Sequence, residues 1–453
     1  MTDEIKKIYR STPENDLVAE LCFYGKMDMD QLDFMVTVIR ERKLARTYLT
    51  EAGNIRLVHL TPEALDGVLK DARNADIPVT EGSFRPPVQV FCPALSGMKE
   101  DEIFDVAPYA AKTREYLQTL PAQTGQDAAA FRIYFAGCEQ DLSDAEDCDM
   151  IFLAVEKDLF RILIRDTQGI LFPLTPKTTA ARFLSYVKAA LSLRQTERTA
   201  EAYPAAFWSA MNALSDDDRA DVPVEEPVIQ KTGKGDFTCG PQVYKQKQPD
   251  LYAAVSHPYA GVVPVSYWKK LQTILTGNEY TDVEIRMDRK RTLYICNLLA
   301  DEVHLPLTAL PETAYTSAER SGVSDRCGVC PAGTADPQLF VSTMLKGLRQ
   351  LRLTEKVLPS FTLSGCPCCC PDVPREDLIF IMQKESPEDL PEGQYCQVIL
   401  HADHDRDLGY ILYKNAFPFL MALGSLVQAS GMIFPQWYPQ NMELLPRLTA
   451  LYR

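Results

Sequence analysis

Two hydrophobic patterns alternate along the chain, one with the period of a helix and one typical of buried strands. Helical spacing is clearest in residues 30–43, where the apolar residues Leu32, Phe34, Met35, Val38 and Ile39 are expected on one face. Similar patterns predict further helices over residues 105–120, 180–193, 337–351 and 417–430. Short apolar runs predict strands over residues 132–136, 150–155, 160–164, 360–363, 378–382 and 397–400. Strands that alternate with helices indicate α/β or α+β layers rather than a bundle or a sandwich.

The predicted layout occurs twice, and short matches recur in the same order in both halves. The matching pairs are Cys92-Pro-Ala and Cys330-Pro-Ala, Ala136-Gly-Cys138 and Ser364-Gly-Cys366, Asp149-Met-Ile-Phe-Leu and Asp377-Leu-Ile-Phe-Ile, and Phe183-Leu and Phe419-Leu. Each copy begins with a short strand–helix–strand unit, over residues 17–59 and 261–297, and continues with a longer unit. The acidic, proline-rich residues 215–234 are the expected linker. The order of the matches indicates a duplicated fold.

Composition narrows the class of protein. A chain of 453 residues is long enough for roughly two to four domains. A net charge of −15 disfavours binding to nucleic acid and to anionic membranes. The N-terminal residues are charged and lack the apolar stretch of a secretory signal, and the uncharged residues 416–434 contain Pro418 and Gly424, which favours a buried helix over a membrane span. We therefore expect a cytoplasmic protein, in which 13 cysteines do not form a disulfide framework.

Six cysteines lie between positions 327 and 370. They form two groups, Cys327-Gly-Val-Cys330 and Cys366-Pro-Cys368-Cys369-Cys370. Thiolates bind soft or borderline metals, and two short-spaced pairs are typical of both iron–sulfur clusters and tetrahedral zinc sites. The alternative is a set of buried apolar thiols. However, four cysteines in five residues, flanked by Gly365 and Pro371, do not suit a buried strand.

The repeat divides these cysteines into two classes. Cys330 and Cys366 have counterparts in the first copy at Cys92 and Cys138, whereas the other candidate ligands have none. Two thiols cannot close a site with four thiolate ligands. The sequence therefore predicts one metal centre per chain, in the second copy.

Five segments are characteristic of a known family. They are Phe104-Asp-Val-Ala-Pro-Tyr109-Ala, Ile151-Phe-Leu-Ala-Val-Glu-Lys157, Gly261-Val-Val-Pro-Val with Val283-Glu-Ile-Arg286, and Leu363-Ser-Gly-Cys366-Pro-x-x-Cys370. On the basis of these segments the chain resembles the sirohaem-dependent nitrite and sulfite reductases. The resemblance extends over nearly the whole chain. The resemblance implies a duplicated α+β fold of mixed α/β layers. Two ferredoxin-like half-domains (residues 1–80 and 229–310) would alternate with two larger α/β domains (residues 81–228 and 311–453).

The resemblance also implies a [4Fe–4S] cluster with four ligands, Cys327, Cys330, Cys366 and Cys370. In the family the last of these, here Cys370, also bridges the cluster to the iron of sirohaem. The family's first pair is usually Cys-x5-Cys, which places Ser324 at the first ligand position, so Cys327 would substitute through a shift of the loop. Cys368 and Cys369 replace the family's Asn-Gly, either as alternative ligands or redox-active thiols, or without function.

A small anion bound for reduction requires positive charge and proton donors, and Arg and Lys supply both. The carboxylates of sirohaem need further basic partners. At positions where the family supplies basic residues, this chain has Ala52, Pro87 and Ala130. Arg132 remains basic and is the expected catalytic residue.

A basic run in the second copy compensates for these losses. It consists of Arg286, Arg289, Lys290 and Arg291, which we expect on one strand and near the cofactor. Alternation would send Arg289 and Arg291 to one face and Lys290 to the other. The alternative is a solvated strand face. His401 and His404 are a weaker candidate pair for metal binding, because His-x-x-His at a strand end is more often a surface feature.

The resemblance implies an oxidoreductase that passes electrons from an external donor, a ferredoxin-like protein or a partner subunit, to a small anion such as sulfite or nitrite. The chain contains no flavin or NAD(P)H module. The alternative is a diverged, non-catalytic member that keeps an iron–sulfur or zinc site as a structural or electron-relay element. The replaced basic positions favour the alternative, and the enriched cysteines favour a retained metal.

Overall fold

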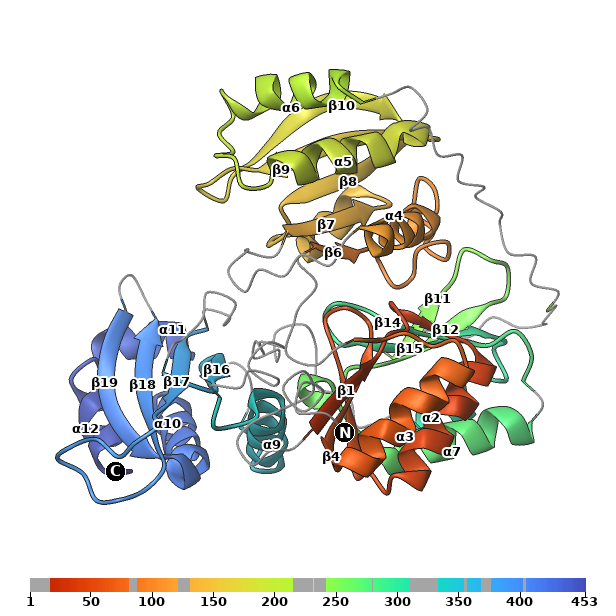
Figure 1. Ribbon diagram of the computed structural model, residues 1–453. Coiled ribbons are helices and arrows are strands. Elements are labelled where there is room, and N and C mark those ends of the chain that lie inside the picture. The colour runs from red at the N-terminus through yellow and green to blue at the C-terminus, as the bar shows by residue number, and fades with distance from the viewer. Residues whose placement is uncertain are drawn as a thin grey trace.

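The computed structural model shows an α+β protein, as the sequence predicts (Figure 1). It describes residues 17–80, 88–120, 131–214, 231, 242–278, 280–309, 333–353, 357–367, 376–401 and 405–453. Four sheets with associated helices make up these residues. Two of the sheets lie together in the paired half-domains, and one lies in each large domain (Figure 1).

The two half-domains exchange strands. The first sheet has the order β13-β3-β4-β1-β5 and the second has the order β11-β12-β15-β14-β2. Thus β13 (Val262–Pro264) of the second copy pairs with β3 (Arg46–Leu49), and β2 (Lys26–Met27) of the first copy pairs with β14 (Glu284–Met287). The remaining strands are β1 (Leu17–Leu21), β4 (Ile55–Leu60), β5 (Val79–Thr80), β11 (Val243–Lys245), β12 (Tyr252–Ser256) and β15 (Leu293–Leu298). Because each sheet includes one strand from the other copy, neither half-domain forms a complete sheet by itself.

One hydrophobic core lies under both of these sheets. Four helices contribute to it: α2 (Met29–Glu41), α3 (Pro62–Asn74), α7 (Val265–Gly277) and α8 (His304–Ala309). The face predicted for residues 30–43 is confirmed for Leu32, Met35, Val38 and Ile39, which are buried, whereas Phe34 is only partly buried and packs against the same core. They share the cluster with Trp268 of α7, whose indole N–H donates a 2.7 Å hydrogen bond to Thr47 Oγ1.

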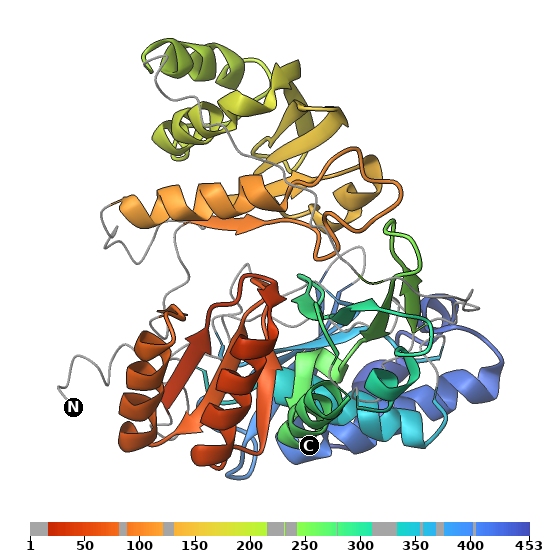
Figure 2. The ribbon, with the colours of Figure 1, turned by 90° about the vertical axis from the view of Figure 1, so that its right-hand side faces the viewer.

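The first large domain has a five-stranded sheet of order β10-β9-β8-β7-β6. Its strands are β6 (Val88–Phe91), β7 (Phe131–Ala136), β8 (Met150–Glu156), β9 (Leu159–Arg165) and β10 (Leu171–Thr179), and its helices are α4 (Ala107–Thr119), α5 (Phe183–Leu193) and α6 (Tyr203–Asn212). The pairs β6–β7 and β7–β8 are parallel, and the pairs β8–β9 and β9–β10 are antiparallel. Stacked Phe135 and Phe152 mark the centre of the core, with ring centroids 4.7 Å apart. Figure 2 shows this domain above the half-domains.

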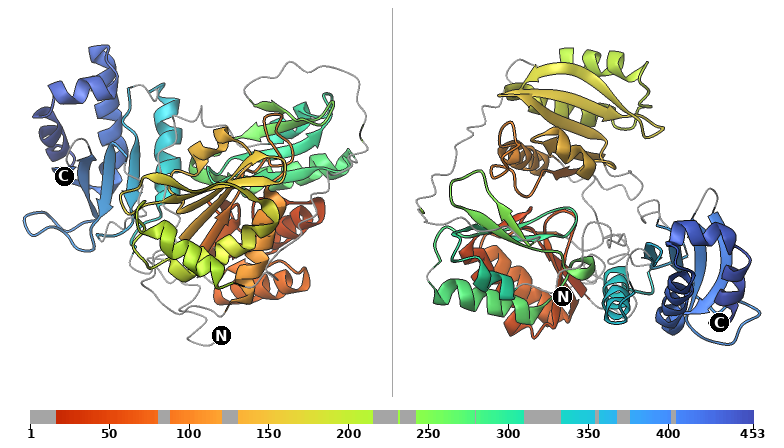
Figure 3. Two further views of the ribbon diagram at one scale, coloured as in Figure 1. Left: turned by 90° about the horizontal axis from the view of Figure 1, so that it is seen from above. Right: turned by 180° about the vertical axis from the view of Figure 1, so that it is seen from behind.

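The second large domain repeats this arrangement in the order β16-β17-β18-β19. Its strands are β16 (Phe361–Ser364), β17 (Leu378–Met382), β18 (Tyr395–His401) and β19 (Asp405–Leu412), and its helices are α9 (Pro337–Gln350), α10 (Ala416–Ser430), α11 (Phe434–Trp437) and α12 (Leu444–Ala450). Again a parallel pair is followed by antiparallel pairs. Figure 3 shows this domain beside the half-domains. The strand order β7-β8-β9-β10 of the first large domain is thus repeated as β16-β17-β18-β19 in the second, in agreement with the sequence repeat.

Most predicted helices and strands are found within a few residues of their expected bounds, although residues 180–182 form a 3-10 turn before α5. The sequence patterns did not predict α3, β10 or β19. The predicted linker, apart from Lys231, lies outside the described residues, as do the residues at or next to the proposed domain boundaries. Those boundaries stay predictions.

The apolar residues 416–434 form α10 and the start of α11, and one face of α10 is buried in the core of the second large domain. Within the described part of the chain, no single helix has both the length and the apolar character needed to cross a membrane. One pair of segments passes the same test together, Tyr413–Ser430 with Phe434–Gln440, but it is bent by 77°.

Candidate functional site

Cys366 lies just beyond the end of β16 and is 2% exposed. The Ser364 hydroxyl donates a 2.9 Å hydrogen bond to the Cys366 carbonyl oxygen, which fixes the turn out of the strand. Thr334 approaches the same turn from the other cysteine-bearing segment. Its backbone N–H donates to the Gly365 carbonyl oxygen at 2.6 Å, and its hydroxyl donates to the same oxygen at 3.2 Å. The segment that follows Cys330 therefore lies against the residue that precedes Cys366.

The other predicted ligands, Cys327, Cys330 and Cys370, lie outside the described residues, as do Ser324, Cys368 and Cys369. Among the described residues, no group of three or more His, Cys, Asp or Glu side chains could hold a metal ion. The four-thiolate set thus stays a prediction. Thr334, which follows the first ligand pair, contacts Gly365, which precedes the second. The buried thiol of Cys366 lies next to this contact in the sequence.

The corresponding turn of the first copy has the same backbone contact. Here the Ile103 N–H donates to the Gly137 carbonyl oxygen at 2.9 Å, beside Cys138. The surroundings of the thiol differ, because the Lys99 ammonium donates to Cys138 Sγ at 3.2 Å and to Asp141 Oδ1 at 2.5 Å. Burial and the Asp141 carboxylate raise the pKa of Cys138. This thiol is therefore part of a polar contact within the first large domain.

Arg286 docks the second half-domain on the first large domain. Its Nη1 donates to the carbonyl oxygens of Ala94 at 2.9 Å and Ser96 at 2.7 Å. Its Nε and Nη2 donate to the Glu284 carboxylate at 2.9 and 2.7 Å. The guanidinium is buried and its geometry matches these partners on two sides.

The expectation of one basic strand is wrong for three of the four residues. Strand β14 ends at Met287, and Arg289, Lys290 and Arg291 form the turn to β15. The Asp288 side chain causes this reversal, because it accepts a 2.7 Å hydrogen bond from the backbone N–H of Thr292. Alternation between sheet faces does not apply in a turn.

The turn residues Arg289 and Lys290 also contact the first large domain. Arg289 donates to the Asp144 carbonyl oxygen at 2.5 Å, pairs with the Asp147 carboxylate at 2.8 Å, and lies 4.2 Å from the centroid of the Phe91 ring. Asp147 also pairs with Arg132, and Lys290 pairs with the Asp144 carboxylate. The structure therefore brings Arg132 and Arg289 together around one aspartate.

Arg291 points the other way, toward the first half-domain. Its φ of +60° is in the left-handed region, and its Nη2 lies 3.5 Å from Glu51 Oε1. His401 pairs with Asp405 at the exposed end of β18, and His404 lies outside the described residues. Of the predicted basic run, Arg286, Arg289 and Lys290 thus contact the first large domain, whereas Arg291 contacts the first half-domain.

A polar cluster that the sequence did not reveal joins the half-domains to the second large domain. Gln338, in the first turn of α9, donates to the carbonyl oxygens of Leu49 at 3.0 Å and Ala260 at 2.9 Å. It also accepts a 3.3 Å hydrogen bond from Arg56, whose other nitrogen pairs with Glu20. Arg56 is 4% exposed, and its Nε has no hydrogen-bond partner among the residues that the structure describes. Gln338 follows Asp336-Pro337, a pair typical of a helix start. That local pattern does not predict the contacts of Gln338 with residues far away in the sequence.

The donor sets differ in how well they suit the two implied groups. Cys366, in a buried turn between two cysteine-bearing segments, suits a thiolate-bound cluster. The basic residues suit the carboxylates of sirohaem less well. Arg286, Arg289, Lys290 and Arg132 already pair with carboxylates of the chain itself. A tetrapyrrole carboxylate would have to displace those partners.

The fold and these turns define a duplicated α+β protein of paired half-domains and large domains. The sequence matches no known protein-family model and no curated protein. Among solved structures, the chain is similar to that of the NirA protein of Mycobacterium tuberculosis, with a TM-score of 0.64 and 16% sequence identity. The similarity covers 93% of this chain and 82% of the NirA chain. At this identity it shows a shared fold.

Proposed function

We propose that the chain is an iron–sulfur oxidoreductase related to the sirohaem-dependent nitrite and sulfite reductases. Its [4Fe–4S] cluster is held by Cys327, Cys330, Cys366 and Cys370, and sirohaem is its second cofactor. A cluster at this position would supply one-electron transfer. The donor is an external ferredoxin-like protein or a partner subunit, and the acceptor is a small anion of the sulfite or nitrite type.

The contact between Thr334 and Gly365 carries this proposal. It holds the segment after Cys330 against the turn of Cys366, as a site with ligands from two loops requires. The resemblance of the cysteine motifs and the fold shared with the NirA protein support the same conclusion. The chain's own contribution is a buried thiol in a turn whose Gly365 and Cys366 carbonyl oxygens accept hydrogen bonds from Thr334 and Ser364.

Anaerobic purification followed by a visible spectrum and by iron and acid-labile sulfide analysis tests the proposal. A [4Fe–4S] cluster gives a broad visible shoulder with iron and sulfide in equal amounts. Sirohaem adds a Soret band and a red band. A colourless protein that contains zinc would rule out the oxidoreductase.

The internal ion pairs favour a second candidate function. Because Arg132 and Arg289 share Asp147, and Arg286 pairs with Glu284, these side chains do not present free positive charge to an anion. A diverged member that keeps its cluster as a structural or relay element, without sirohaem, would show this pattern. The spectrum separates the two candidates, since the second predicts the cluster shoulder without the Soret band.

A further inference from the structure

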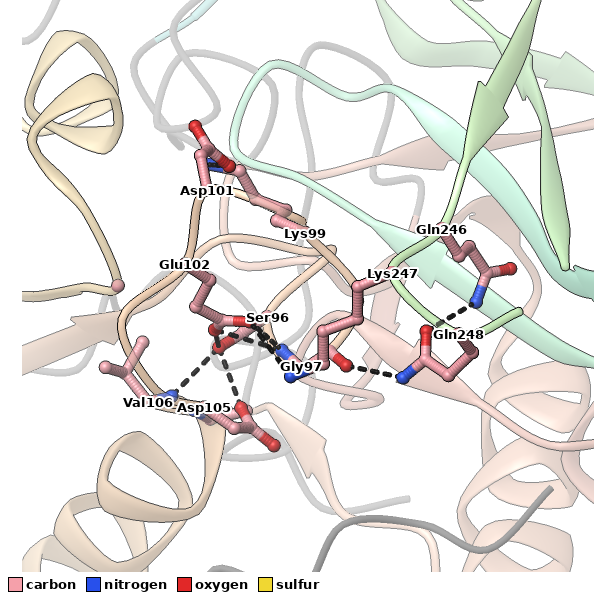
Figure 4. A network of polar contacts seen from close by, with 12 residues as sticks. Ser96, Gly97, Lys99, Asp101, Glu102, Asp105, Val106, Gln246, Lys247 and Gln248 are labelled. Atoms are coloured by element: carbon pink, nitrogen blue, oxygen red, sulfur yellow. Dashed lines mark hydrogen bonds and ion pairs between the residues drawn. The ribbon is translucent and has the colours of Figure 1, made fainter. Parts of the chain in front are cut away.

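The loop of residues 92–106, between β6 and α4, contains two carboxyl groups that face one hydroxyl (Figure 4). Ser96 Oγ lies 2.6 Å from Glu102 Oε1 and 2.7 Å from Asp105 Oδ1. It also accepts a 2.9 Å hydrogen bond from the backbone N–H of Val106. A hydroxyl has one proton, so Ser96 can donate to one carboxyl group only. The second short O···O contact requires a proton on one of the two carboxyl groups.

The surroundings identify Glu102 as the protonated partner. Asp105 Oδ1 accepts a 3.0 Å hydrogen bond from the Ala107 N–H at the start of α4, where the helix dipole favours negative charge. The Glu102 side chain is 1% exposed, and burial raises its pKa to about 7, with Asp105 adding to the effect. Ser96 therefore donates to Asp105 and accepts from the Glu102 carboxyl group.

Few other charges reach Glu102. Lys247 Nζ, from the segment before β12, lies 4.0 Å from Glu102 Oε2. Lys99 and Asp101 are on the same loop, but Lys99 pairs with Asp141. Just after the end of β7, Gly137 packs so closely that a Cβ there would lie 2.9 Å from Glu102 Cγ. The backbone N–H of Gly97 donates to both carboxyl oxygens of Glu102, at 3.0 and 2.7 Å. A charged Glu102 thus relies on this N–H and on Lys247 for compensation.

The same loop is the contact surface for the second half-domain. The Ser96 carbonyl oxygen accepts from Arg286, and the Gly97 carbonyl oxygen accepts a 2.7 Å hydrogen bond from Gln248 Nε2. The Met98 carbonyl oxygen accepts a 2.9 Å hydrogen bond from the backbone N–H of Lys247. Three successive carbonyl groups therefore depend on the conformation that the Ser96 hydroxyl fixes.

We infer that Glu102 carries a proton bound to Ser96, and that release of this proton toward alkaline pH loosens the contact between the loop and the second half-domain. Two negative carboxylates would then face a hydroxyl with one proton. The loop relieves the repulsion by turning one carboxylate outward, which moves Ser96 and Gly97. This device is independent of the metal centre and of the proposed function.

Infrared and hydrogen-exchange measurements on the full chain test the inference. The difference spectrum between wild type and Glu102→Gln at about pH 6 should contain the carbonyl stretch of a protonated carboxylic acid. The amide protection of Val106 and Lys247, corrected for intrinsic exchange, should fall up to about tenfold per pH unit above pH 7. Glu102→Gln, which mimics the neutral acid, should remove this dependence. Glu100→Gln, a change at an exposed neighbour, should retain it.

Asp105→Asn gives a second test that does not depend on the first variant. Removing the Asp105 charge should shift the loss of the Glu102 acid band to lower pH, because the two carboxylates repel when both are ionised. The loop should keep its protection, since only one carboxylate then faces Ser96. Absence of the carboxylic acid band, or the same pH profile in wild type and Glu102→Gln, would overturn the inference. Loss of the carboxylic acid band in Asp105→Asn with its retention in Glu102→Gln would place the proton on Asp105 and overturn it as well.

Discussion

The backbone N–H of Thr334 donates a 2.6 Å hydrogen bond to the carbonyl oxygen of Gly365. This bond joins the two segments that contain the predicted cluster ligands, since Thr334 follows Cys330 and Gly365 precedes Cys366. The first copy has the same contact between Ile103 and Gly137. The backbone frame is therefore common to both copies, whereas the full set of cysteines occurs in one.

Cys366→Ser should abolish the visible absorbance of the cluster and its bound iron, because an alcohol is a poor ligand for iron in a sulfide cluster. Cys396→Ala is the matched control. Cys396 is a buried, free cysteine of the same domain, in contact with Met382 Sδ at 3.3 Å. Its substitution should leave the iron content unchanged.

The remaining cysteines test the ligand assignment. Serine at Cys327, Cys330 or Cys370 should have the same effect as at Cys366, whereas Cys368→Ser and Cys369→Ser should retain the cluster. Loss of iron in Cys368→Ser with retention in Cys370→Ser would contradict the assignment. Iron and acid-labile sulfide per chain, measured after anaerobic purification, give the answer.

Local patterns predicted much of the fold. The face of α2 and the bounds of β17 follow from the spacing of apolar residues within one element. The strand exchange could not be predicted in this way, because the pairing of β2 with β14 depends on residues far apart in the chain. Similarly, the cysteine motif is visible in the sequence, but the carboxylates that pair with Arg289 are not.

Gly97→Ala should destabilise the first large domain more than Gly169→Ala. Both glycines have left-handed φ values, +83° and +87°, so alanine at either costs about 1 kcal/mol in backbone strain. A Cβ at Gly97 would also lie 2.9 Å from Asp105 Oδ2, whereas nothing lies within 4 Å at Gly169. The added crowding should cost roughly 1–3 kcal/mol. Denaturant midpoints of the two variants measure the difference, and equal midpoints would contradict the close contact.

Thr47→Val should weaken the packing between the half-domains. Thr47 Oγ1 accepts the indole N–H of Trp268 at 2.7 Å, and both residues are buried. Valine keeps the shape but leaves that donor unsatisfied, at a cost of about 1–3 kcal/mol. Thr273→Val, on the exposed side of α7, should change stability by less than about 0.5 kcal/mol. The tryptophan fluorescence of thermal unfolding distinguishes the two variants.

Arg289→Gln should be far more damaging than Lys290→Gln, although the residues are neighbours. The Arg289 side chain is 11% exposed and that of Asp147 is 47% exposed, so losing this half-buried ion pair and the bond to the Asp144 carbonyl oxygen should cost about 1–3 kcal/mol. The Lys290 side chain is 40% exposed, and its pair with Asp144 should contribute less than about 1 kcal/mol. Thermal unfolding of both variants, with metal content measured in parallel, separates a docking role from a cofactor role. Normal stability with loss of sirohaem in Arg289→Gln would favour the cofactor role.

The same docking contact should weaken in acid. Burial alone would raise the pKa of Asp147, but the positive charges of Arg289 and Arg132 outweigh it and hold the pKa below its usual value. A carboxyl group with a lowered pKa stabilises the folded state fully above its unfolded pKa of about 3.9, and this contribution is lost as the pH falls through the lower folded value. Asp147→Asn should therefore show a smaller loss of stability on acidification than wild type, and Glu146→Gln, at an exposed neighbour, should behave as wild type.

Urea midpoints measured between about pH 2 and 6 test this, because the wild-type and Asp147→Asn curves should converge at the acid end. Parallel curves would show that the pairs with Arg289 and Arg132 do not hold Asp147 ionised.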